Sequence, residues 1–196
     1  MRKELTYYST SDKLTDVSGF RDFTDWLSPD PRVIFQVVQG LIIHDEWLER
    51  YGVNVRSEQK RSVCTPSASD ILHQLERLRT RKLSFALPRS PEEKVIACCR
   101  EFALLSTALF RAKGIPARAR CGFALYLAEQ GFYEDHWVCE YWNGTEWIAI
   151  DPQVDPFQQS TFQYYANTHQ PIEPAYKEIL LSLDPLHVTS KHFINA

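Results

Sequence analysis

The chain has 196 residues, of which 44% are hydrophobic and 24% are charged, and its formal net charge is −3. This length and composition are typical of one globular domain with a core of its own. The small negative charge disfavours nucleic-acid binding, which usually requires a basic face. The sequence also lacks an unbroken apolar segment as long as a membrane span.

The cysteines and the N-terminus predict a cytoplasmic protein. Five cysteines stand at positions 64, 98, 99, 121 and 139. An odd number with two adjacent residues suits reduced thiols better than a disulfide framework. Residues 1–6 lack the apolar run of a signal peptide. Because there is no Cys-x-x-Cys pair, we expect no structural zinc site.

Two helices are predicted in the first 80 residues. Asp30 and Pro31 form an N-cap followed by proline at the first helical position, so we expect a helix from there to Tyr51. Its polar segment His44–Glu46 is expected to face solvent, because consecutive helical residues point about 100° apart and cannot easily share one metal. A second helix is expected to begin near Thr65.

A third helical stretch contains two adjacent cysteines. Ser90–Glu93 is a capping box with proline at the first helical position, and the helical pattern continues to Lys113. A break near Ile96–Cys98 would place Cys99 at a helix N-terminus, where unpaired N–H groups and the helix dipole favour the thiolate. One uninterrupted helix would place Cys99 more than two turns inside it and remove this effect. We favour the break.

From residue 117 onward the sequence predicts strands, at 117–127, 136–142 and 146–150. Asn143-Gly144 lies between the last two and is a strong hairpin signal, because a type I′ turn needs positive φ at both central positions. His136 stands seven residues before Asn143, and Asp151 stands seven after Gly144. A hairpin centred on this dipeptide would pair them on one face, with Cβ atoms about 4.5–5.5 Å apart.

The same register assigns the remaining side chains of the hairpin to faces. Trp142 and Trp147 share the face of His136, and we predict that they bind substrate in an aromatic groove. Trp137 and Cys139 fall on the opposite face and are expected to belong to the core. A carboxylate held against an imidazole supplies two of the three members of a nucleophilic triad.

Several short motifs follow one another in a fixed order. They are Cys99-Arg100-Glu101-Phe102-Ala103, Gly114-Ile115-Pro116-Ala117-Arg118, Gly122-Phe123, His136-Trp137 with Glu140, and Trp147 with Asp151-Pro152. In this order and spacing, about residues 90 to 156 resemble the core of the transglutaminase-like superfamily. One position departs from the family's pattern, which usually has glycine two residues before the nucleophile, where this chain has Ala97.

The resemblance implies a site and a fold. Cys99 would be the nucleophile and also an oxyanion donor through its backbone N–H, with His136 the base and Asp151 its orienting partner. The implied fold class is α+β and papain-like, with the nucleophile-bearing helix packed on an antiparallel sheet after a helical N-terminal region. Residues 1–89 would be that helical region of the same domain, 90–157 the catalytic core, and 158–196 a C-terminal extension of unassigned role.

The resemblance also implies a reaction. The expected function is cysteine-dependent acyl transfer on amide bonds of a peptide or protein, through a thioester acyl-enzyme. Water as acceptor would make the protein a peptidase or deamidase, and an amine would make it transglutaminase-like; we favour hydrolysis. No metal and no organic cofactor are expected. Two alternatives stay open: acyl transfer like that of arylamine N-acetyltransferases, and a catalytically idle transglutaminase-like binding domain.

Overall fold

The computed structural model describes residues 3–54, 66–78, 85, 87, 89–169 and 171–196. The helices are α1 (Lys3–Ser9), α2 (Arg21–Thr24), α3 (Pro31–Leu41), α4 (Ala68–Arg77), α5 (Cys99–Ala112), α6 (Pro156–Thr168) and α7 (Pro174–Ser182). The strands are β1 (Ile42–His44), β2 (Val95–Ala97), β3 (Ala117–Ala124), β4 (Glu134–Trp142), β5 (Trp147–Ile150) and β6 (Phe193–Asn195). In the described part of the chain, no helix is long and apolar enough to cross a membrane.

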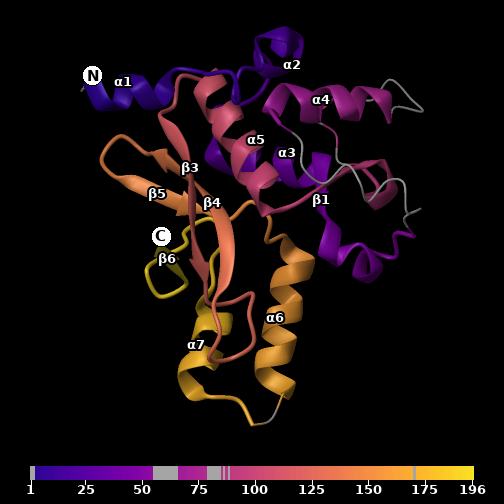
Figure 1. Cartoon of the computed structure of the whole chain (residues 1–196), viewed down its shortest axis with the longest axis vertical. Coiled ribbons are helices and arrows are strands. Elements are labelled where there is room, and N and C mark those ends of the chain that lie inside the picture. Colours follow the sequence, from indigo (N-terminus) through magenta and orange to yellow (C-terminus); the bar gives the residue numbers. More distant parts are fainter. Residues whose placement is uncertain (1–2, 55–65, 79–84, 86, 88, 170) are drawn as a thin grey trace.

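The strands of the described residues form two sheets (Figure 1). Strands β5, β4, β3 and β6 lie in this order in an antiparallel sheet, and β1 pairs with β2 in a small parallel one. Helix α5 lies beside the antiparallel sheet, with α3 and α4 on its other side. This arrangement confirms the α+β class with the cysteine-bearing helix on an antiparallel sheet.

One hydrophobic cluster joins the N-terminal helices to the sheet through α5. It contains Ile34 and Val38 from α3, Leu105 and Leu109 from α5, and Cys139 and Ile150 from the sheet. Because α5 is buried between both layers, its position is fixed by contacts from residues on either side of it in the sequence.

A second hydrophobic cluster involves the C-terminal segment. Helices α6 and α7 lie side by side at the end of the sheet where β3 ends (Figure 1). The cluster buries Phe162 of α6 and Leu180 of α7 against Trp47, Ala124 and Tyr126. The sequence left the role of residues 158–196 unassigned, and most of α6 and all of α7 lie in this segment. Helix α6 is capped by Asp155, with proline at the first helical position.

The first long helix is shorter than the sequence predicted. It ends at Leu41, and Ile42 adopts an extended conformation with φ −127° and ψ 156°. Strand β1 then pairs with β2, His44 standing opposite Ala97. The β-branched Ile42 and Ile43 suit a strand. His44 is consequently 8% exposed rather than solvated. The expected start of the second helix at Thr65 lies outside the described residues, and Ser67 caps α4.

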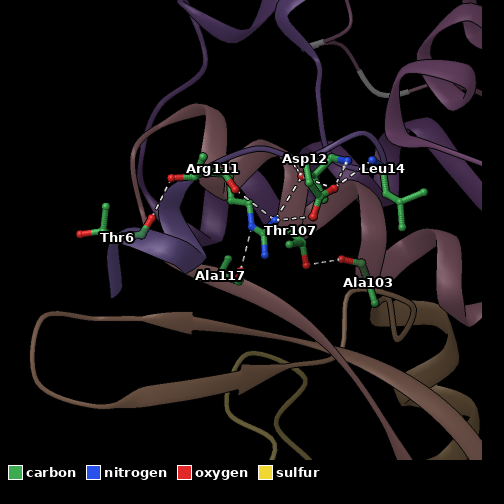
Figure 2. Close-up of polar contacts among 9 residues, drawn as sticks. Thr6, Asp12, Leu14, Ala103, Thr107, Arg111 and Ala117 are labelled. Atoms are coloured by element: carbon green, nitrogen blue, oxygen red, sulfur yellow. Dashed lines mark hydrogen bonds and ion pairs between the residues drawn. The ribbon is translucent and has the colours of Figure 1, made fainter. Parts of the chain in front are cut away.

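Arg111 ties the N-terminal segment to the end of α5 (Figure 2). Its Nε donates to the carbonyl of Ala117 at 3.0 Å, and its Nη1 lies 3.2 Å from the carbonyl of Thr10 and 3.1 Å from the carboxylate of Asp12. Nη1 also donates to the Thr15 hydroxyl at 3.2 Å. The Arg111 side chain is only 8% exposed, whereas that of Asp12 is 55% exposed. The part-buried carbonyl of Ala117 and hydroxyl of Thr15 therefore depend most on Arg111 for hydrogen bonds.

Replacing Arg111 with methionine is expected to lower the free energy of unfolding by about 2 kcal/mol, because partly buried acceptors lose their donor. Methionine keeps most of the apolar stem, so the loss reports hydrogen bonding rather than packing. Urea unfolding measures it. The exposed Arg21 offers the matched control, since Arg21→Met should stay within about 0.5 kcal/mol of the parent. Equal losses in both variants would contradict the assignment.

Candidate active site

The first residue of α5 is Cys99. Strand β2 ends at Ala97, and Cys98 follows as the N-cap with φ −107° and ψ 178°. This confirms the predicted break. The capping box at Ser90 is present, but it closes only the short 3-10 helix Pro91–Glu93. Ala97 lies in a strand, and no described non-glycine residue has a positive φ, so alanine satisfies the backbone where the family usually has glycine.

Cys98 and Cys99 occupy different environments at this helix start. The Glu101 carboxylate accepts hydrogen bonds from the backbone N–H of Cys98 at 3.1 Å and from its thiol at 2.9 Å. Glu101 is completely buried, and its other oxygen lies 2.6 Å from Arg100 Nη2. Cys98 therefore caps the helix. The Cys99 thiol instead accepts a hydrogen bond from the backbone N–H of Trp137.

The contact with Trp137 locates the Cys99 thiol. A backbone N–H lies in the plane of a sheet, and β4 pairs with β5 only as far as Cys139 and Ile150. The Cys99 thiol therefore lies beside Trp137, at the edge of β4 that is no longer paired with β5. His136 is the preceding residue of this strand. The sequence resemblance selected Cys99 over Cys98, and the structure brings Cys99 to the strand that carries the histidine.

His136 and Asp151 form a buried pair. Nε2 of His136 lies 2.9 Å from Oδ2 of Asp151, and their side chains are 1% and 0% exposed. The same carboxylate oxygen accepts a hydrogen bond from the hydroxyl of Tyr126 at 2.5 Å. The other oxygen accepts one from the backbone N–H of Gln153 at 3.0 Å. Because Nε2 faces the carboxylate, Nδ1 is the imidazole nitrogen left for proton transfer.

The hairpin register differs from the prediction by two residues. Trp142 pairs with Trp147, whereas a turn centred on Asn143-Gly144 would pair Glu140 with Trp147. Gly144 has φ 109°. Oδ1 of Asn143 accepts from the backbone N–H groups of Thr145 and Glu146. Since Asn143 has no positive φ, a type I′ turn centred on it does not form.

A two-residue shift preserves the faces of the hairpin, because side chains alternate with a period of two. His136 and Asp151 therefore still share a face, although extending the register puts Val138 opposite Asp151. They are diagonal neighbours, and their side chains meet. Cys139 is fully buried, as expected, and burial raises the pKa of its thiol to about 12. Trp137, expected in the core, is only half-buried.

The ionisation of Asp151 is favoured by its partners. Burial raises the pKa of this carboxyl, but the charge of His136 and the hydrogen bonds from His136, Tyr126 and Gln153 lower it more. The net pKa lies below the ordinary value for aspartate. A fully buried carboxylate thus stays charged because three donors surround it.

The pKa of Cys99 is raised, contrary to the expectation from its helix position. The hydrogen bond with Cys98 and burial both raise it, and these effects exceed the lowering by the N–H of Trp137. The same hydrogen bond lowers the pKa of Cys98. Cys98 and Cys99 therefore titrate as a pair. The first proton lost by the pair leaves a thiolate that accepts a hydrogen bond from the other thiol, and this thiol then loses its proton at a higher pH. The sequence argument considered the helix dipole but not this neighbouring thiol.

Trp142 and Trp147 are not brought to the His136–Asp151 pair. They share its face, but Trp142 lies six residues further along β4, about 20 Å away at the rise of a strand. Trp147 of β5 pairs with Trp142 and is similarly distant. The ring of Trp147 packs 5.2 Å from that of Tyr8, and Arg118 Cζ lies 4.2 Å over it. Trp147 therefore links the hairpin to α1, and Trp142 packs against Trp147 with ring centroids 5.7 Å apart.

His44 is a neighbour that the sequence did not assign to the site. It pairs with Ala97 across β1 and β2, and its ring lies 6.4 Å from that of Phe102 in α5. Burial lowers its pKa, and the charges of His136 and Asp151 also influence it. The Ile42-Ile43 dipeptide was the available signal for a strand here. Within the described ranges, no group of three or more His, Cys, Asp or Glu residues is placed to hold a metal ion.

Comparison with known proteins agrees with this geometry. Residues 80–152 match the family model of the transglutaminase-like superfamily. The matched segment is less than half of the chain, and in it the sequence is similar to a transglutaminase-like core. A search of the curated proteins gives no significant match. At the family level, the match and the fold support a cysteine-based enzyme.

The fold is also similar to a solved structure. That protein, from Cytophaga hutchinsonii, is described as a "putative cysteine protease", with a TM-score of 0.51 and 17% sequence identity. The similarity covers 78% of this chain and 43% of the other. The chain therefore spans less than half the length of that protein. At this level of identity, the likeness shows a shared fold.

Proposed function

We propose that the chain is a cysteine-dependent acyl-transfer enzyme that acts on amide bonds of a peptide or protein, with Cys99 as nucleophile, His136 as base and Asp151 as its partner. The observation that carries the proposal is the buried 2.9 Å contact between His136 Nε2 and Asp151 Oδ2, next to a thiol at the start of a helix. A buried imidazole–carboxylate pair beside a thiol is the arrangement that general-base activation of a nucleophile requires.

The hydrogen bond with Cys98 and burial raise the pKa of Cys99 and so favour its neutral thiol. In the first step, Nδ1 of His136 removes the thiol proton as the sulfur attacks the amide carbonyl carbon. Asp151 stabilises the imidazolium that results. The backbone N–H of Cys99, at the helix N-terminus, donates to the carbonyl oxygen as it becomes negative. His136 then protonates the leaving amine, the carbon–nitrogen bond breaks, and a thioester remains on Cys99.

The second half of the reaction regenerates the thiol. His136 takes a proton from water, whose oxygen attacks the thioester carbonyl; the carbon–sulfur bond breaks and Cys99 regains a proton. We propose water as the acceptor, which gives hydrolysis, while an amine in its place would give transamidation. The described cysteines are free, which suits a reducing compartment such as the cytoplasm. The proposed chemistry uses no metal and no organic cofactor.

Acylation by p-nitrophenyl acetate tests this function without a known natural substrate. Wild-type protein is expected to release a burst of p-nitrophenolate equal to the enzyme concentration and to carry an acetyl group on Cys99, found by peptide mass spectrometry. Cys99→Ala should abolish the burst, whereas Cys98→Ala should retain it. A burst in Cys99→Ala, or acetylation of Cys98 alone, would contradict the proposal. A folded wild-type protein without a burst would support the idle binding domain instead.

A further inference from the structure

We propose that Tyr126 is a positioning residue of the active site, which holds the Asp151 carboxylate against His136 and is itself held by the C-terminal helices. This inference rests on the proposed function for its catalytic consequence. It assigns a role to a residue outside the motifs that define the transglutaminase-like core. It also assigns a role to residues 158–196, which the sequence left unassigned: helices α6 and α7 hold Tyr126 in place.

Three hydrogen bonds fix the orientation of the Asp151 carboxylate. Oδ2 accepts from Tyr126 at 2.5 Å and from His136 at 2.9 Å, while Oδ1 accepts from the N–H of Gln153 at 3.0 Å. Rotation of the carboxylate would break more than one of these contacts. The Tyr126 ring also meets the His136 ring edge to face, with centroids 6.1 Å apart and an interplanar angle of 83°. Tyr126 therefore restrains both members of the pair.

Tyr126 packs against the C-terminal segment. Its ring centroid lies 6.2 Å from that of Phe162 in α6, and its side chain is 1% exposed. The backbone N–H of the preceding Leu125 donates to the carbonyl of His192 at 2.9 Å, near the start of β6. The aromatic ring is thus packed between the C-terminal segment and the triad. Without this packing, Tyr126 would have rotamer freedom that its hydrogen bond alone does not remove.

Electrostatics fixes the direction of the hydrogen bond. Burial and the charge of Asp151 both raise the pKa of Tyr126 well above its usual value, so the hydroxyl stays protonated and donates. A phenol that donates to a carboxylate stabilises the ionised form. Loss of this donor would therefore raise the pKa of Asp151, and protonation of the carboxylate would begin at a higher pH.

The substitution Tyr126→Phe removes only the hydroxyl. The acylation rate constant with p-nitrophenyl acetate should fall by about 10- to 100-fold, the range expected for a hydrogen bond to a charged group. The acid limb of its pH profile should move to higher pH. Tyr51→Phe is the matched control, because the Tyr51 hydroxyl lies 2.6 Å from a carboxylate oxygen of Asp155, outside the triad. The control should leave both rate and profile unchanged.

A second variant and a second readout keep the test decisive. Site-specific 3-fluorotyrosine at position 126 is a stronger donor of nearly the same size, and it should move the acid limb to lower pH. The ¹⁵N chemical shifts of His136, which report the hydrogen bonding of the ring, should change in Tyr126→Phe but not in Tyr51→Phe, whether or not the protein turns over. Unchanged chemical shifts in folded Tyr126→Phe, with a rate within twofold of wild type, would overturn the inference.

The same measurements separate this inference from the proposed function. If wild-type protein gives no burst while the His136 resonances respond to Tyr126→Phe, the positioning role stands and the proposed reaction fails. If wild-type protein gives a burst that Tyr126→Phe leaves intact at every pH, the reaction stands and the positioning role fails.

Discussion

Replacing Asp151 with asparagine is expected to lower the acylation rate of Cys99 by about 10³- to 10⁴-fold, the loss typical of a triad whose histidine changes tautomer. The carboxylate accepts hydrogen bonds from His136 and Tyr126 through one oxygen. An amide at this position offers one acceptor oxygen and an NH₂ group, so it cannot hold the Nε2–H tautomer in the same way. Nδ1 would then carry the proton and could not accept another from the thiol.

The measurement is the single-turnover burst with p-nitrophenyl acetate at neutral pH. Asp155→Asn is the matched control, because Asp155 also accepts a hydrogen bond from a tyrosine hydroxyl and caps α6. Asparagine is as good an N-cap as aspartate, so the control should retain most of the rate. If Asp151→Asn kept more than a tenth of the wild-type rate, Asp151 would not be the partner of the base.

Replacing Gly122 with alanine is expected to destabilise the protein by about 3 kcal/mol, at the upper end of the range for overpacking. An added Cβ would overlap the carbonyl oxygen of Ile194 and lie 2.5 Å from the ring of Phe193. Because one obstacle is backbone, a side-chain movement cannot relieve it. Strand β6 would have to leave β3, where Gly122 pairs with Asn195, and Phe193 would leave its contacts with Val138 and Val188.

Thermal unfolding measures this effect, which corresponds to a fall in Tm of roughly 6–12 °C for a chain of this size. Gly19→Ala is the control, since an added Cβ there meets no atom within 4 Å and Gly19 has no positive φ. The control should change the free energy of unfolding by less than about 0.5 kcal/mol. Similar melting of the two variants would show that the β3–β6 contact contributes little to stability.

The site could be predicted from the sequence as far as local patterns determine it. The face shared by His136 and Asp151 survives an error of two residues in register, because the side-chain period is two. The register depends on the conformation of the turn. In the structure, Oδ1 of Asn143 accepts backbone hydrogen bonds from Thr145 and Glu146, whereas a type I′ turn needs a positive φ at Asn143. The pattern of hydrophobic residues does not distinguish these two turns. The helix break before Cys99 was the favoured one of two possibilities, because no local signal in the sequence separates it from one uninterrupted helix that begins after Ser90.

Other features depend on contacts between distant residues. His44 is buried because β1 pairs with β2, and a parallel pairing over such a separation leaves no local signal. Tyr126 stands outside any motif, and its role arises only when α6 packs on it. The raised pKa of Cys99 follows from the orientation of the adjacent thiol, which a sequence does not contain.

The pairing of β1 with β2 has a consequence for how the protein can be divided. The residues that match the family begin at 80, yet the strand that leads into Cys99 forms its sheet with Ile42–His44. A fragment cut at residue 80 would keep Cys99, His136 and Asp151 and lose the partner of β2 together with the α3 side chains that cover α5. The segment that matches the family therefore does not coincide with one separately packed unit of the fold. Fusions and truncations should retain α3, β1 and also the N-terminal segment, which contacts Arg111 and contributes Val17 and Phe20 to the same cluster.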